Sequence, residues 1–411
     1  MKKLILFLLI GLIGLSGVYA QIPNRGFEFG FDADVLFANN LMTIGDIFNE
    51  SGTIVIDLDK INHGFMVNLG VGAGFHLGIN GKKGWGFSID TGLEATGIFN
   101  TGGIVSFADL ENESFELSGG IFLKADINTY FKVSNFKVTI MPSLFWAAAY
   151  VKPDIKYSFN TVDGVNFDLS AQDVRLYTAF PFDAIQGGQF DFSSITGRPG
   201  FDLTVGLEFP LAKELGISKV LPFLDFDVGA QLQRIPLFPS VLTNYIGMND
   251  VDFSFNMGNF TEIINGAGSS EDGDGNDGED GGSGFLSGWE SGIGEARFSR
   301  PFIFVAYANW RPLWGNRILT ITPMIGFAVN QLRNESLAFD CGINATLDLA
   351  NILVVTAGIN RIDSIWINSL DVALNIRLIQ INFGVDMRSQ EFLSSWNAGG
   401  LGVKLGLRLG W

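Results

Sequence analysis

The chain contains only two histidines, His63 and His76, among its 411 residues. A hydrolytic site built on a serine or aspartate nucleophile needs a histidine or a similar base beside it. Neither histidine lies in a recognisable nucleophile motif, and no Gly-x-Ser-x-Gly sequence follows the first twenty residues. The single cysteine, Cys341, excludes an intramolecular disulfide and is typical of a small residue within a strand. We therefore predict that the chain is not an enzyme.

A second candidate for chemistry is the segment SSEDGDGNDGEDGGSG, residues 269–284. Acidic residues separated by glycine cannot build a core, so the segment is predicted to be a flexible, solvated surface loop. It also suggests a weak calcium site, although Asp277 stands where a calcium loop needs glycine and Ser283 where it needs glutamate. No other cofactor is predicted. The first three ligand positions of such a loop are matched by Asp272, Asp274 and Asn276.

Ionisable residues on strand-like segments form the third group. They recur at alternate positions among glycine, asparagine and serine, while the positions between them are apolar. Acids outnumber bases, so a wall lined by this set would favour cations or neutral solutes over anions. The alternative is a solvated or salt-bridged wall without a role in selection. The candidates are Asp90, Glu94, Glu116, Lys124, Asp126, Asp340, Asp386, Arg388, Lys404 and Arg408.

The elements that position these residues are predicted from the alternation itself. The last eleven residues, LGVKLGLRLGW at 401–411, place apolar residues at every odd position and glycine or a cation at every even one. The same period of two recurs at 65–79, 115–131, 201–209, 337–349 and 379–388. A period of two is the signature of a β-strand with two different faces. The fold class is therefore predicted to be all-β.

Strand length and composition favour a membrane barrel over a soluble sandwich, which also alternates. Many runs extend over 11–17 residues, whereas soluble strands are commonly about 5–6 residues and membrane strands about 9–11. The polar faces hold small residues rather than the lysine and glutamate of a solvated sheet. Tryptophan prefers the headgroup level, and four tryptophans near predicted strand ends suggest an aromatic girdle. They are Trp85, Trp310, Trp314 and Trp411.

The amino terminus predicts export. Lys2 and Lys3 precede an apolar core and the small-residue site that ends at Ala20, so residues 1–20 are predicted to be a signal peptide cleaved after Ala20. No later run of about eighteen apolar residues predicts a helical span. The net charge of −17 argues against nucleic acid as a partner. The predicted location is the bacterial outer membrane.

The spacing of the strands predicts the domain organisation. Short turns alternate with long loops, as in outer-membrane barrels, and predict one barrel of about 14–16 antiparallel strands over residues 21–411. Prolines and short runs blur the strand boundaries between Pro181 and Gly258. The segment 39–62 combines a helix-like face with an alternating run and is predicted as a lid or plug, or as an ordinary outer loop. Residues 259–299 are predicted as a long acidic, glycine-rich extracellular loop.

The stretch IGDIF…IVIDLDKIN, Ile44 to Asn62, the glycine-rich strand that follows it and the aromatic carboxyl terminus carry a resemblance. With them the chain resembles an uncharacterised outer-membrane barrel family, a domain of unknown function from Bacteroidetes and spirochaetes. That family is distantly like long-chain fatty-acid transporter barrels. The resemblance implies about fourteen strands and no catalytic motif. The Asn-Pro-Ala hatch signature of the fatty-acid transporters is absent, and Ile22-Pro23-Asn24-Arg25 stands near the amino terminus instead.

These features lead to two functional hypotheses. The first is a pore or transporter for small or hydrophobic solutes, because a barrel of this size encloses an aqueous or plugged interior. The second is a surface-exposed structural or interaction protein with a closed lumen that binds through its extracellular loops. Outer-membrane lipid is an expected partner in both cases, as is the barrel-insertion machinery, which would act through the C-terminal strand.

Overall fold

The structure, a computed structural model, describes residues 26–39, 66–81, 84–100, 113–151, 154–160, 166–179, 196–256, 290–313, 318–330, 337–389, 392–396 and 399–410. The predicted signal peptide and nearly all of the predicted lid or plug at 39–62 lie outside these residues. Within the described ranges, no helix is both long and apolar enough to cross a membrane.

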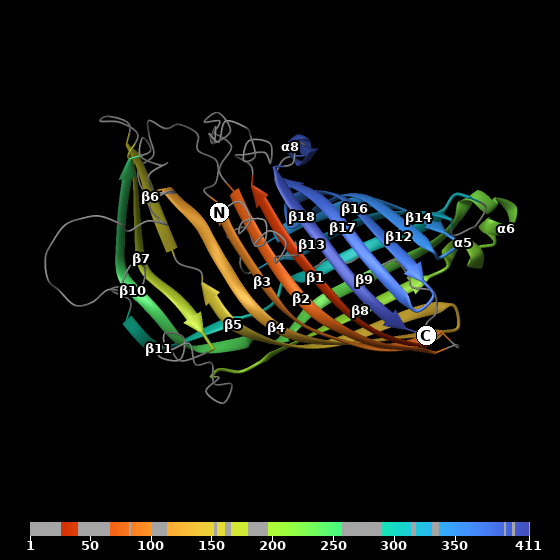
Figure 1. Cartoon of the computed structure of the whole chain (residues 1–411), viewed down its shortest axis with the longest axis horizontal. Coiled ribbons are helices and arrows are strands. Elements are labelled where there is room, and N and C mark those ends of the chain that lie inside the picture. Colours follow the sequence, from red (N-terminus) through yellow and green to blue (C-terminus); the bar gives the residue numbers. More distant parts are fainter. Residues whose placement is uncertain are drawn as a thin grey trace, which may run out of the picture.

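The described strands form a single antiparallel sheet that closes on itself (Figure 1). Closure occurs where the first strand, β1, pairs with the last, β18, in a ladder that runs from Glu28 opposite Gly410 to Ala38 opposite Gly400. A closed ring satisfies backbone groups that hydrocarbon cannot bind. The predicted all-β class and single barrel are confirmed.

Eighteen described strands occupy fourteen positions around the barrel, within the predicted range of fourteen to sixteen. Ten positions hold one strand each: β1 (Phe27–Asn39), β2 (Met66–Gly81), β3 (Trp85–Asn100), β4 (Glu113–Val133), β13 (Leu319–Val329), β14 (Leu337–Leu349), β15 (Leu353–Ile362), β16 (Ile365–Ile376), β17 (Ile379–Ser389) and β18 (Gly400–Gly410). Four adjacent positions hold two strands in succession: β5 (Phe136–Val151) with β6 (Asp154–Asn160), β7 (Asn166–Thr178) with β8 (Gly200–Phe209), β9 (Asp225–Phe238) with β10 (Ser240–Asn256), and β11 (Glu290–Phe298) with β12 (Phe302–Arg311).

The two faces of the sheet have the polarity of a barrel in lipid. Large apolar side chains lie exposed on the outer face, among them Phe75 at 57%, Phe339 at 59% and Leu405 at 44%. Charged side chains are buried on the inner face, where Asp386 is 1% and Arg408 is 4% exposed. A soluble sandwich would bury the first set and expose the second.

Each of the four divided positions contains a proline where its strand is interrupted. Proline lacks the backbone N–H that a ladder needs, so it weakens pairing within a sheet, although Pro142 of β5 and Pro323 of β13 lie within continuous strands. Beyond the breaks, β6, β7, β10 and β11 continue as a wall at the left end of Figure 1. The prolines are Pro153, Pro199, Pro239 and Pro301.

The two ends of the barrel differ in their connections. At the end that carries the carboxyl terminus, turns such as 134–135, 350–352 and 377–378 are short, and we call this the short-turn end (Figure 1, right). One connection there is longer and helical, made of α5 (Leu211–Glu214), α6 (Ile217–Val220) and η2 (Pro222–Leu224). The opposite, loop end carries α8 (Phe392–Trp396) and the long connections.

The predicted loop at 259–299 is wrong over its last residues, because Glu290–Phe298 form β11. The sequence ESGIGEARF has one large apolar residue before Phe298, so it shows no alternation. Pairing with β10 makes it a strand. Residues 257–289, which include the acidic segment, lie outside the described residues.

Candidate functional site

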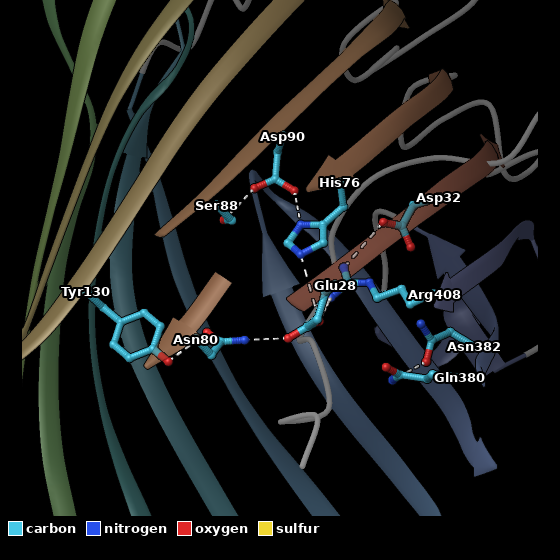
Figure 2. Close-up of polar contacts among 10 residues, drawn as sticks. All are labelled: Glu28, Asp32, His76, Asn80, Ser88, Asp90, Tyr130, Gln380, Asn382 and Arg408. Carbon is cyan, nitrogen blue, oxygen red and sulfur yellow. Dashed lines mark hydrogen bonds and ion pairs between the residues drawn. The ribbon is translucent and has the colours of Figure 1, made fainter. Parts of the chain in front are cut away.

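The lumen near the short-turn end holds a polar cluster, shown in Figure 2. His76 on β2 places Nδ1 2.6 Å from Oδ1 of Asp90 on β3, and its Nε2 lies 3.9 Å from Oε2 of Glu28 on β1. The amide of Asn80 donates to Glu28 at 2.5 Å, and the Tyr130 hydroxyl donates to Asn80 at 2.9 Å. These contacts connect β1, β2, β3 and β4 from the inside.

Arg408 on β18 extends this cluster across the closing seam of the barrel (Figure 2). Its guanidinium lies 3.3 Å from Asp32 and 4.0 Å from Glu28, both on β1. The stem of Arg408 passes directly over Gly30, where an added Cβ would lie 2.7 Å from Cγ of the arginine. The first and last strands are therefore joined by a backbone ladder and by ion pairs on the lumen side.

Further into the lumen, Lys124 and Arg234 converge on one carboxylate. Lys124 Nζ lies 3.5 Å from Oε2 of Glu94, and Arg234 Nη2 lies 4.0 Å from the same oxygen. Arg234 interrupts β9 with a positive φ of 55°, at an irregularity in the ladder between β8 and β9. Arg234 lies at this irregularity and faces the lumen, which the alternating pattern of the sequence did not predict.

A second group of charges lies on the β16–β18 wall. Lys404 lies 3.5 Å from Asp371 and 3.7 Å from Asp386. Arg388 binds the same Asp386 with both Nε and Nη2. A buried charge is tolerated when it is paired and hydrogen-bonded. These pairs account for the low exposure of Asp386.

Asp34 is different from its neighbours. It lies opposite Lys404 in the ladder between β1 and β18 and is 2% exposed. Within the described residues, neither of its carboxyl oxygens has a hydrogen-bond partner. The lumen therefore holds one acidic group whose burial is not offset by a direct contact.

Arg300 anchors the region where the wall strands break. It follows the end of β11, its side chain is 3% exposed, and it donates to both carboxyl oxygens of Asp202 at 2.8 and 2.9 Å. Its Nη2 also lies 3.3 Å from Asp126, which in turn accepts a hydrogen bond from Ser143. The guanidinium carbon stands 5.0 Å from the ring centroid of Phe145. This one side chain ties the break between β11 and β12 to β4, β5 and β8.

Apolar side chains gather on the inner face beside Arg300. The rings of Phe122 and Phe298 stack with centroids 4.5 Å apart, and Tyr150 lies 5.4 Å from Phe298. Phe122 shares its strand face with Lys124, and Phe145 shares its face with Ser143, so both belong to the lumen side. We call this set the break cluster: Phe122, Phe145, Ala147, Ala179, Leu242 and Phe298.

Two further residues that were predicted to face the lumen are Asp340 and Glu116. Asp340 is 4% exposed and accepts a hydrogen bond from the backbone N–H of Asp363 at 2.8 Å. Glu116 lies on β4 opposite Asn100, and its side chain is outside the described set. Sequence reasoning missed Arg300, because this residue stands in a Ser-Arg-Pro connection and not in an alternating run. The proline that follows Arg300 in the sequence was the signal that could have indicated a break in the strand there.

The described residues include only part of the predicted aromatic girdle and none of the predicted calcium ligands. Trp85 begins β3 at the short-turn end and is 47% exposed. Trp310 lies near the end of β12 and donates its Nε1–H to the carbonyl oxygen of Phe223 at 2.7 Å. Trp314 and Trp411 lie outside the described residues, as do the calcium candidates Asp272, Asp274 and Asn276. In the described ranges, no group of three His, Cys, Asp or Glu side chains could hold a metal ion.

No protein-family model matches the chain, and no curated protein matches it in sequence. Among solved structures, the chain is similar to the toluene transporter TodX of P. putida, with a TM-score of 0.46 and 9% identity over 95% of this chain and 91% of that one. It is also similar to CymD, a monoaromatic hydrocarbon channel (TM-score 0.44, 10% identity, 95% and 89% covered). The chain is also similar to a FadL homologue of Pseudomonas aeruginosa, with a TM-score of 0.42 and 10% identity over 93% of this chain and 88% of that one. The resemblance to a family of Bacteroidetes and spirochaetes stays a prediction.

Proposed function

We propose that the chain is an outer-membrane barrel that takes up small hydrophobic solutes. The observation that carries the proposal is the break cluster, a group of aromatic and aliphatic side chains on the inner face of a lumen that is otherwise polar. Apolar contact stabilises an apolar solute at about 25 cal/mol per Å² of buried surface. The side chains of the break cluster are packed against one another and are at most 3% exposed, so a solute contacts them only if the rings move apart. An uncharged solute then gains more from this level of the lumen than from the ion-paired levels nearer the short turns.

At the same level, β11 has a described ladder on one edge only. β11 pairs with β10 along one edge, and within the described residues no ladder joins its other edge to β13. Ile293 on β11 is 90% exposed. An edge of β11 without a described ladder, beside an apolar cluster, supports a route by which an apolar solute leaves the lumen through the wall. Lipid would take up such a solute readily.

The paired charges oppose a wide aqueous channel. Lys124, Arg300 and Arg408 each lie within 4.0 Å of a carboxylate from another strand. These ion pairs hold the paired side chains inside the lumen. A hydrated ion that crosses the lumen would have to displace these side chains. The proposal therefore predicts selection for neutral apolar solutes over ions.

The test is uptake by cells whose outer membrane carries the full-length chain. We expect the initial rate of uptake of a labelled monoaromatic hydrocarbon to rise on expression, while uptake of a labelled sugar stays at its background rate. Phe298→Asp should abolish the gain, because a carboxylate replaces the stacked ring in the break cluster. Phe298→Leu is the matched control, since it keeps an apolar side chain at the same position of the break cluster.

An unchanged hydrocarbon rate with the folded chain present in the outer membrane would overturn the proposal. A current through the purified chain in a planar bilayer, carried equally by small cations and anions, would contradict it as well. The surface-interaction hypothesis would then remain, and deletion of residues 269–284 would test it by loss of surface binding.

A further inference from the structure

The helical connection between β8 and β9 is the one long insertion among the described connections at the short-turn end (Figure 1, right). It consists of α5, α6 and η2, residues 211–224, and we call it the foot. Each of these helices has three or four residues, too few to be stable without support from the barrel. Its position must therefore be fixed by contacts with the barrel rim.

Two hydrogen bonds fix the foot. Glu214 of α5 accepts a hydrogen bond from the amide of Asn135, which lies in the turn between β4 and β5, at 2.6 Å. At the other end of the foot, the carbonyl oxygen of Phe223 accepts the Nε1–H of Trp310 at 2.7 Å. Ala212 of α5 is fully buried. The foot is thus attached at both ends and has a defined orientation.

Trp310 shows on which side of the wall the foot lies. The next residue, Arg311, turns its guanidinium to Asp225 and Asp227, on the inner side of the wall. Successive residues of a strand point to opposite faces, so Trp310 points outward. Phe223 is bound to an outward-facing side chain, and the foot therefore lies on the lipid side of the rim.

The surface of the foot is apolar to an unusual degree. Leu215 is 63%, Val220 78%, Leu221 41% and Phe223 46% exposed. At the end of β4, next to the turn that binds Glu214, Val133 is 55% exposed and continues the apolar outer face of the strand. Exposed patches of large apolar side chains mark a surface that another apolar phase covers.

We propose that the foot is a membrane-interface anchor that embeds in the lipid leaflet facing the short-turn end. The occupant of the patch is lipid because the patch is continuous with the lipid-facing surface of the barrel and is bound to an outward tryptophan at headgroup level. Lys213 and Lys219 are exposed on the same segment and supply positive charge for headgroup phosphates. The anchor would fix the depth of the short-turn rim, next to the divided strands β9 and β12.

The experiment measures the depth of spin labels in the full-length chain, reconstituted in lipid nanodiscs. Cys341 is replaced by alanine, and single cysteines carry nitroxides at Val220→Cys and at the adjacent Lys219→Cys. Leu405→Cys, on the outer face of β18, reports whether the barrel itself lies in lipid. Collisions with oxygen, which concentrates in lipid, are compared with collisions with a water-soluble nickel chelate.

We expect the label at 220 to resemble the label at 405, rich in oxygen collisions and poor in nickel collisions, while the label at 219 collides with nickel. A label at 220 that is as accessible to nickel as the one at 219, with 405 still protected, overturns the anchor and leaves the patch to a protein partner. Nickel collisions at 405 would refute the membrane barrel itself. The uptake assay is independent of the outcome at 220, so failure of the anchor and failure of the proposed function are distinguished.

The lysines are tested separately in the Val220→Cys chain. Lys213→Glu with Lys219→Glu should increase nickel collisions at 220 in nanodiscs of phosphatidylglycerol, and the increase should be smaller in phosphatidylcholine. Equal behaviour in the two lipids would refute the role of the lysines in binding headgroups.

Discussion

Asp34 and Asp202 show how differently two buried carboxyl groups are held in the same lumen. Asp202 is 1% exposed and binds Arg300 through both oxygens. Asp34 is 2% exposed and, within the described residues, has no hydrogen-bond partner for either oxygen. Burial of a charge costs free energy unless a partner offsets it. The same residue type therefore stabilises one site and destabilises the other.

Asp34→Asn should stabilise the barrel by about 1–3 kcal/mol at alkaline pH, where the carboxyl group is ionised, because it removes an unpaired buried charge without changing the shape of the side chain. The measurement is the denaturant midpoint of the chain in lipid vesicles, followed by tryptophan fluorescence. Asp202→Asn is the matched control and should lower the midpoint. A lower midpoint for Asp34→Asn would mean that the carboxylate is stabilised by longer-range attraction to Lys404.

Arg300→Met should destabilise the barrel by about 3–5 kcal/mol, because Asp126 and Asp202 are left as uncompensated buried charges. Arg300→Lys should recover only part of the loss, since an ammonium cannot bind both oxygens of Asp202 in the same planar geometry. The same unfolding assay measures both variants. Full stability of Arg300→Met would show that the ion pairs do not hold the strand breaks together.

At the scale of elements, the four strand breaks coincide with prolines and with the close approach of neighbouring backbones. Ser240, which begins β10, donates its hydroxyl to the carbonyl oxygen of Arg198 at 3.0 Å and accepts the backbone N–H of Ala147 at 3.1 Å. Gly197 adopts a φ of 90°, and an added Cβ there would lie 2.1 Å from the carbonyl oxygen of Val241. The backbone around Gly197 therefore packs closely against the start of β10.

Gly197→Ala should destabilise the barrel by at least about 1 kcal/mol, because alanine is strained at positive φ and its Cβ meets backbone that cannot move aside. Gly97→Ala, in β3, is the matched control: an added Cβ there has nothing within 4 Å, and its φ lies outside the positive range. Thermal unfolding followed by circular dichroism compares the two. Equal midpoints for both variants would show that the break tolerates displacement.

At the scale of the whole molecule, the inverted polarity of the two faces requires an apolar surrounding. The outer face of β18 exposes Leu405, Leu407 and Leu409 at 43–47%, while Arg408 between them is 4% exposed. Water around the first set would cost free energy for every exposed apolar side chain. We therefore expect the folded state to depend on lipid or detergent as solvent.

Leu405→Arg should destabilise the barrel in a bilayer by about 2–4 kcal/mol if position 405 lies near the midplane. Leu313→Arg, at the short-turn end where Leu313 is 39% exposed, should cost about 0–1 kcal/mol, because the arginine reaches the interface. Urea unfolding in vesicles measures both. Similar losses at the two positions would contradict the depth that the barrel geometry assigns to them.

The sequence by itself determined the strand period, the polarity of each face and the closed all-β class, because alternation over ten or more residues fits only a strand between two different environments. It placed Leu401 to Leu409 and residues 379–388 in strands that the structure contains. It did not place β11, because ESGIGEARF has no alternation and becomes a strand only through its ladder with β10. Local residue order carries the period, but a partner strand far along the chain supplies the pairing.

Only the tertiary structure decided which charges meet. Arg300 binds Asp126 and Asp202, which are 174 and 98 residues away in the sequence. Arg408 meets Asp32 across a separation of 376 residues, because the barrel closes between its first and last strands. Periodicity fixes the face on which a side chain lies but not its partner, since the partner depends on strand order, register and the level of the four proline breaks.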